Sequence, residues 1–263
     1  MNTYTYINFL IFITTTISYY LFFKPTIKQS DTIEPVNVQN YTTSNYYYML
    51  IYFLFVLVGQ LVTNILTVIT KCGSSSFKNL MLALVFTIVP WTLIFGVMIL
   101  LLLIYPSIKK GFADVVGYLF ISGKAHQYIN QIIELDKTIA NKFTGKPEIF
   151  INVLTPLNFN DYFNDLTRKN VPEPTAGNIL EDGAIETIKD SLFKLIVNKD
   201  NIGEIMWIIY TGLLLIAIVQ YYITNNSCSN DKLTLQDNYK KYIAIQEEKQ
   251  TNQDSSPITY AQA

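Results

Sequence analysis

Four apolar runs constrain this chain more than any other feature, because none of them contains Asp, Glu, Lys, Arg or His. They are Tyr4–Phe23, Tyr46–Ile69, Leu80–Ile104 and Ile205–Ile223. Each run is long enough to cross a hydrocarbon core of ~30 Å at ~1.5 Å per helical residue. A helix in a soluble core would carry a polar stripe, and these runs do not. The sequence therefore predicts an all-α integral membrane protein with four transmembrane helices.

The apolar runs also divide the chain. We expect three transmembrane helices with short loops over residues 1–104 (4–23, 46–69 and 80–104), a helical extramembrane domain over 105–204, the fourth span over 205–223 and a polar, partly disordered tail over 224–263. Four crossings place both termini on one face of the membrane, called side A, and the 105–204 domain on the other face, side B. We call it the side-B domain. No basic residue precedes the first run and no small-residue cleavage site follows it, so we expect a retained span rather than a signal peptide.

The side-B domain shows helical periodicity in three places. Apolar residues recur at three- and four-residue steps over Ser107–Phe143, where Gly117 and Gly123 predict a bend or close packing. A shorter helix is expected over Asn158–Lys169. An amphipathic helix over Asn178–Val197 leads towards the fourth span. Its polar face is mixed in charge, which favours packing against the first helix over lying on the membrane surface.

Polar residues inside the apolar runs are few. Gln60 and Asn64 stand four residues apart, so they share one face of the second span. We expect them to form polar contacts between helices, which contribute about 0.6–2 kcal/mol in membranes. A polar pore lining is the alternative interpretation. In the third run, Pro90 removes a backbone donor and predicts a kink.

The two cysteines follow two different spans. Cys72 comes after the second run and Cys228 after the fourth, so both are expected near the membrane surface on side A. They would form a disulfide if side A is oxidising, and would be candidates for lipidation if it is cytosolic. Two unpaired thiols remain the third interpretation. The lysines near the spans favour a cytoplasmic side B.

The sequence offers no set of residues for catalysis. His126 is the only histidine, the cysteines show no metal-ligand spacing, and Asp161, Asp165 and Glu186 fit a solvated face. We therefore expect no catalytic residues, no metal ligands and no cofactor, and a protein that is not an enzyme. The net charge of -1 gives no basic field for nucleic acid, so none is expected as a partner.

One segment beside the third span resembles known proteins. It begins Pro106-Ser107-Ile108-Lys109-Lys110-Gly111-Phe112-Ala113-Asp114-Val115-Val116-Gly117-Tyr118 and continues to Lys124-Ala125. It resembles a segment of uncharacterised membrane proteins of large nucleocytoplasmic DNA viruses, the algal and amoebal giant viruses. The likeness covers roughly residues 95–135 and contains no catalytic signature. It implies a virion membrane protein of the viral internal membrane, present in host endomembranes during assembly.

These observations lead to one functional expectation and one alternative. We expect a structural or assembly membrane protein that links the lipid bilayer to capsid or core proteins, or to other virion membrane proteins, through non-catalytic contacts. A small channel or transporter-like protein is the alternative, and an oligomer is left open. Among the residues, Gln60 and Asn64 distinguish the two, because a channel needs polar side chains that face a lumen.

Overall fold

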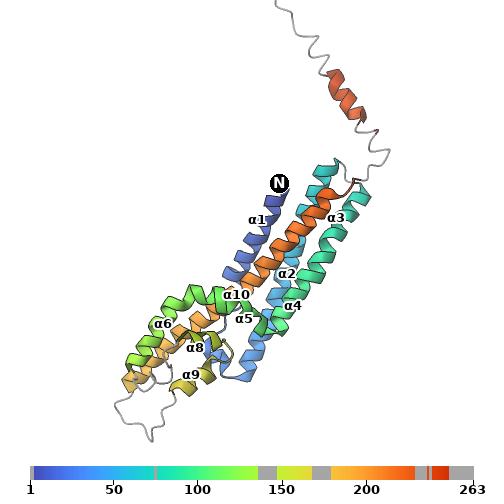
Figure 1. Ribbon diagram of the computed structural model, residues 1–263. Helices are drawn as coiled ribbons and strands as arrows, with labels where there is room; N and C mark the ends of the chain where they lie inside the picture. Colours follow the sequence, from blue (N-terminus) through green and yellow to red (C-terminus); the bar gives the residue numbers. More distant parts are fainter. Residues whose placement is uncertain are drawn as a thin grey trace, which may run out of the picture.

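The computed structural model describes residues 3–73, 76–135, 147–167, 179–228, 236 and 239–248. All regular structure in these residues is helical (Figure 1). Four helices are long and apolar enough to cross a membrane, namely Tyr6–Phe23, Pro35–Cys72, Phe77–Ile104 and Ile185–Asn225. The predicted all-α class and the four membrane-length helices are therefore confirmed. The tail is helical over 239–248, and the disorder expected after 248 falls outside the described residues.

The elements follow one another along the chain, with η marking short 3-10 and π-helical turns. They are α1 (Thr3–Ser18), η1 (Tyr19–Phe23), η2 (Gln29–Thr32), α2 (Pro35–Cys72), α3 (Phe77–Pro90), η3 (Trp91–Gly96), α4 (Val97–Ile104), η4 (Pro106–Lys109), α5 (Lys110–Phe112), η5 (Ala113–Gly117), α6 (Tyr118–Leu135), α8 (Pro147–Val153), α9 (Phe159–Thr167) and α10 (Ile179–Asn225). The N-terminus, the connection between α2 and α3, and the end of α10 lie at one end of the bundle (Figure 1). The start of α1 and the end of α10 therefore lie at the same end of the bundle, and the C-terminus itself falls outside the described residues.

The helix that contains the second apolar run starts earlier than the sequence predicted. We expected a connecting segment up to Asn45, but α2 begins at Pro35 and extends into side B. Proline suits the first position of a helix because its fixed φ is helical and its missing N–H would have no partner there. The polar residues that follow Pro35 concealed this start. At the other end, Gly73 has a φ of +63° and its N–H bonds to the carbonyl of Ile69, which closes the helix.

Aromatic side chains fill the core of the bundle. Phe12, Trp91 and Phe95 are completely buried, and the Trp91 and Phe95 rings lie 4.9 Å apart between centroids. Trp91 and Phe95 belong to η3, the π-helical turn directly after Pro90. The break predicted at Pro90 therefore takes the form of a change in helix type. A Cβ at Gly212 would overlap the Phe12 ring, so glycine allows α10 to approach α1.

A second hydrophobic cluster forms the core of the side-B domain. It joins α6, α8, α9 and the first half of α10, and includes Ile129, Ile132, Ile151, Phe163 and Leu192. The amphipathic helix packs against α6, as expected. It continues without interruption into the fourth span, so α10 is one helix of 47 residues that runs through both clusters (Figure 1).

The first helix of the domain is less regular than its periodicity predicted. It starts with η4, α5 and η5 before α6, and the part expected over 136–143 lies outside the described residues. Gly117 is the site of close packing, because a Cβ there would lie 2.6 Å from the carbonyl oxygen of Lys199. Around Gly123, by contrast, a Cβ would meet open space. Of the bend or close packing predicted for these glycines, close packing is therefore confirmed at Gly117 and is not found at Gly123.

Candidate functional site

Three charged residues from distant parts of the chain meet in a buried cluster at the side-B end of the spans. The Oε1 of Glu204 lies 2.5 Å from Nζ of Lys24, and its Oε2 lies 2.5 Å from Nζ of Lys109. The hydroxyl of Tyr20 donates to Oε1 at 2.7 Å. The Glu204 side chain is fully buried and the two lysine side chains are nearly so. We call Lys24, Lys109 and Glu204 the ion cluster.

The charges of the ion cluster depend on one another. Burial lowers the pKa of Lys24, and the attraction of Glu204 opposes this effect without cancelling it. Burial also acts to lower the pKa of Lys109, but Glu204 and Asp200 outweigh it, so this pKa lies above its ordinary value. Asp200 lies 3.5 Å from Nζ of Lys109 and supplies a second carboxylate. Removing one buried charged residue would leave the charges of the others buried without an opposite charge beside them.

Each member of the ion cluster is the charged residue closest to the side-B end of one apolar run. Lys24 follows the first run directly, Lys109 is the first charge after the third run, and Glu204 immediately precedes the fourth. Because these three runs end at the same end of the helical bundle, their flanking charges meet there. The cluster therefore joins the end of η1, the start of the side-B domain and α10.

Small and aromatic residues bring α10 close to the turn that carries Lys109. A Cβ at Gly203 would lie 2.7 Å from the backbone carbonyl oxygen of Lys109 and 2.7 Å from Cβ of Ala113. One turn further along α10, the indole Nε1 of Trp207 donates to the carbonyl of Ile108 at 2.9 Å. These contacts hold Glu204 in reach of Lys109.

A third buried lysine holds the side-B domain together. Lys199 on α10 is 2% exposed, and its Nζ lies 3.0 Å from Oδ1 of Asp114. The same ammonium donates to the backbone carbonyls of Ile151 at 3.0 Å and Asn152 at 3.3 Å. Lys199 thereby ties α8 and η5 to α10, one turn before the ion cluster.

Asn64 connects all four spans in the interior of the bundle. Its Oδ1 accepts from Asn8 on α1 at 2.8 Å and from Gln220 on α10 at 2.7 Å. Its Nδ2 donates to the hydroxyl of Thr87 on α3 at 2.9 Å. Gln60, one turn earlier, donates to the backbone carbonyl of Asn8 at 3.0 Å. Gln60 and Asn64 thus make the interhelical contacts that their spacing indicated, and both are buried against neighbouring helices.

The two cysteines lie together at the side-A end. Cys72 and Cys228 form a disulfide with their Cα atoms 5.4 Å apart. The ammonium of Lys71 beside it donates to the carbonyls of Ile223 at 3.0 Å and Thr224 at 2.8 Å, at the end of α10. Of the three interpretations of the cysteines, the structure contains the disulfide. It closes the side-A end of α10 against α2.

The remaining residues considered for chemistry do not converge. His126 is partly buried and shares a 3.2 Å hydrogen bond with the hydroxyl of Tyr118. Asp161 and Asp165 are exposed on α9, and Glu186 is an exposed residue of α10 that pairs with Lys189 at 3.6 Å. Within the described part of the chain, no group of three His, Cys, Asp or Glu residues lies close enough to hold a metal ion.

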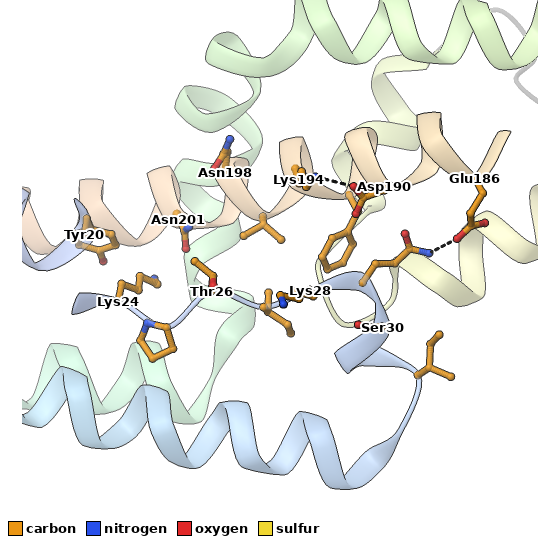
Figure 2. Close-up of a pocket in the computed structure, with 16 residues that line it drawn as sticks. Tyr20, Lys24, Thr26, Lys28, Ser30, Glu186, Asp190, Lys194, Asn198 and Asn201 are labelled. Carbon is orange, nitrogen blue, oxygen red and sulfur yellow. Dashed lines mark hydrogen bonds and ion pairs between the residues drawn. The ribbon is translucent and has the colours of Figure 1, made fainter. Parts of the chain in front are cut away.

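A cavity of about 740 Å³ lies beside the ion cluster, between the segment 24–33 and α10. Figure 2 shows Lys24 and Thr26 on the 24–33 side of this cavity, with Asn201 of α10 opposite them. At its far end, the amide of Gln29 donates to Glu186 at 3.3 Å. The polar lining carries both signs of charge, so it does not select an anion or a cation.

Comparison with known proteins adds no relative, because no family model, curated protein or solved structure matches the chain. The function must therefore be inferred from the geometry. The ion cluster was not predicted from the sequence, where the lysines near the spans indicated orientation only. The sequence signal that could have indicated the cluster is that each of three separate runs has a charged residue next to its side-B end.

Proposed function

We propose that this protein is a structural or assembly protein of a viral internal membrane, which links the bilayer to capsid or core proteins by non-catalytic contact. The observation that carries the proposal is α10, one helix that passes from the core of the side-B domain into the core of the bundle. The ion cluster fixes this helix at the junction. A domain held in this way presents its surface at a fixed orientation to the membrane.

The segment that resembles giant-virus membrane proteins has a structural role in this fold. Lys109 belongs to the ion cluster, Asp114 pairs with Lys199, and Gly117 packs on the backbone of α10. These residues attach the side-B domain to α10 and are not grouped around a reactive centre. The resemblance therefore supports a scaffold that positions a domain, and the viral setting of the proposal comes from this resemblance.

The disulfide supports an orientation for the proposed function. Disulfides persist in oxidising compartments and are rare in the cytosol. The Cys72–Cys228 bond therefore favours side A facing a lumen, with the side-B domain facing the cytosol. Lysines near the spans favour the same orientation. Capsid and core subunits are made in the cytosol, so the side-B domain is the part that would meet them.

The outer face of α9 is the surface that we propose for the partner. Phe159 and Phe163 point into the domain core, which leaves Asp161, Tyr162 and Asp165 on the outside. Tyr162 is 47% exposed and shares a surface hollow with the two aspartates. Tyrosine is enriched in protein interfaces, and the adjacent carboxylates favour a partner with a basic patch.

A channel is the second candidate, because the bundle interior contains polar residues. The amides of Asn8, Asn64 and Gln220 are hydrogen-bonded to one another across helices. Side chains that are hydrogen-bonded to one another stabilise helix packing, and few of their polar groups are left to bind a permeating ion. Purified protein in vesicles should therefore show no selective ion flux. A flux that is abolished by changing Gln60 and Asn64 would favour the channel instead.

Cross-linking in infected cells tests the proposed contact. We expect cross-links from the wild-type side-B domain to a capsid or core protein, and their loss when Asp161, Tyr162 and Asp165 are changed together to Lys, Ala and Lys. The matched controls are His126→Ala and Glu186→Gln, which lie elsewhere on the domain and should retain the cross-links. Equal cross-linking of the triple variant and the controls would contradict a contact through α9.

A further inference from the structure

Three large apolar side chains stand exposed on the side-B domain beside the end of the first span. They are Val115 in η5, and Leu119 and Phe120 at the start of α6, with exposed fractions of 62%, 70% and 75%. Val115 and Leu119 stand four residues apart and so share one face of the helix, and Phe120 follows Leu119 directly. We call these three residues the apolar shoulder.

The opposite face of the same stretch is already packed. Ala113 and Gly117 are buried against α10, and Ile121 and Ala125 lie in the core of the side-B domain. The apolar shoulder is therefore a second apolar face, on a helix whose inner face is fully used. Contiguous exposed apolar surface marks a site of contact with a partner or a membrane.

The apolar shoulder is continuous with the lipid-facing surface of the first span. Phe120 lines one hollow together with Leu21 and with Ile205 of α10. Leu21 and Phe22, at the end of the span, are themselves 70% and 77% exposed. Figure 1 shows the start of α6 beside the side-B end of α1. The same bilayer that covers Leu21 and Phe22 therefore reaches the shoulder.

Lysines flank the apolar shoulder on both sides. Lys124 is exposed one helical turn after Phe120, and Lys110, which is partly exposed, precedes Val115. Lysine buries its alkyl stem along apolar surface and keeps its ammonium in water or among phosphates. Apolar residues bordered by lysines are typical of helices that lie in the membrane interface.

We infer that the apolar shoulder inserts into the boundary between headgroups and acyl chains of the side-B leaflet. The partner is thus a phospholipid surface. The side-B domain then rests on the membrane at a second point besides α10, which limits its tilt. This inference requires that the four helices span a membrane, but it does not depend on the capsid partner proposed above.

The test measures the depth of a nitroxide label in full-length protein reconstituted into phosphatidylcholine vesicles. Leu119→Cys places the label on the shoulder at an exposed position, and the native cysteines are held in their disulfide. Tyr162→Cys is the matched control, since Tyr162 is also exposed and α9 lies farther from the spans (Figure 1). Oxygen concentrates in the bilayer and a water-soluble nickel chelate does not, so their relative collision rates report depth.

We expect the label at position 119 to collide several-fold more with oxygen, relative to nickel, than the label at position 162. Phe120→Cys should give the same result. A label at position 119 that meets nickel as readily as the control would overturn the inference. The vesicles contain no other protein, so only lipid can shield the label at position 119 from nickel. If the shoulder instead binds a protein partner, the label stays in water and meets nickel, which also overturns the inference. A non-reducing gel checks that the Cys72–Cys228 bond is intact in each labelled variant, so that the label sits on the introduced cysteine alone.

Discussion

Glu204 and Lys24 form an ion pair of 2.5 Å although 180 residues separate them in the chain. The pair brings the end of the first span against the point where α10 enters the bundle. With Lys109 on the other carboxylate oxygen, it holds three segments at one buried junction. The orientation of the side-B domain relative to the spans therefore depends on a few charged atoms.

Changing Glu204→Gln should destabilise the protein strongly. The substitution keeps the size of the side chain but leaves the ammonium groups of Lys24 and Lys109 buried without their shared carboxylate. Breaking a buried ion pair from one side costs about 3–5 kcal/mol. Unfolding by SDS titration in mixed micelles measures this loss. The control Glu186→Gln removes an exposed carboxylate and should shift the midpoint little.

A second variant separates charge from packing at the same junction. In Lys24→Met combined with Glu204→Gln, one uncompensated ammonium is gone, while Asp200 still lies near Lys109. We expect the double variant to be more stable than Glu204→Gln alone. If instead the two changes simply added their losses, the ion cluster would not be acting as a unit.

Changing Asn64→Leu should weaken the bundle without unfolding the side-B domain. The change removes hydrogen bonds to Asn8, Thr87 and Gln220, each from a different span. Interhelical hydrogen bonds contribute about 0.6–2 kcal/mol in membranes, so losing three should cost a few kcal/mol. The matched change Gln39→Leu, at an exposed position on the same helix, should have little effect. Equal midpoints for both variants would show that Asn64 is not a structural hub.

Two glycines on α10 should respond differently to the same substitution by alanine. Gly212→Ala places a Cβ against the Phe12 ring and should cost about 1–3 kcal/mol through overpacking. A methyl group added at Gly183 would meet open space, so Gly183→Ala should be neutral or stabilising by up to ~1 kcal/mol. Adding Phe12→Leu to Gly212→Ala should recover part of the loss. Equal unfolding midpoints for the two single alanine variants would contradict close packing of α10 on α1.

The side-B core should tolerate charge less well at Leu192 than at Ile188. Leu192 is completely buried, whereas Ile188 is only partly buried against the same cluster. An unpaired carboxylate in an apolar core costs several kcal/mol. We therefore expect the thermal unfolding transition of the side-B domain to be absent in Leu192→Asp. In Ile188→Asp the transition should remain, with its midpoint lowered by a smaller amount. An unchanged melt for Leu192→Asp would show that α10 does not pack on α6.

Much of the fold follows from short-range features of the sequence. The uncharged runs were sufficient to predict the four membrane-length helices. The four-residue spacing of Gln60 and Asn64 indicated that both lie on one face of their helix. The start of α2 was placed too late, because the polar residues after Pro35 resemble a loop. Pro35 itself was the overlooked signal.

The ion cluster required information that periodicity does not contain. Lys24, Lys109 and Glu204 each flank an ordinary apolar run, and nothing local distinguishes them from other flanking charges. Their meeting depends on which spans are neighbours and on how closely Gly203 lets α10 approach the backbone near Lys109. Both depend on tertiary packing. The disulfide likewise joins residues 156 positions apart, and the sequence left it as one of three interpretations.

We propose that the protein links a viral internal membrane to capsid or core proteins by contact alone. Quantitative mass spectrometry of purified virus particles, taken across a density gradient, tests it most directly. We predict that the copy number of this protein stays in a fixed ratio to the major capsid subunit in every particle fraction. A protein that is missing from the particles, or whose ratio to the capsid subunit varies freely between fractions, would contradict the claim.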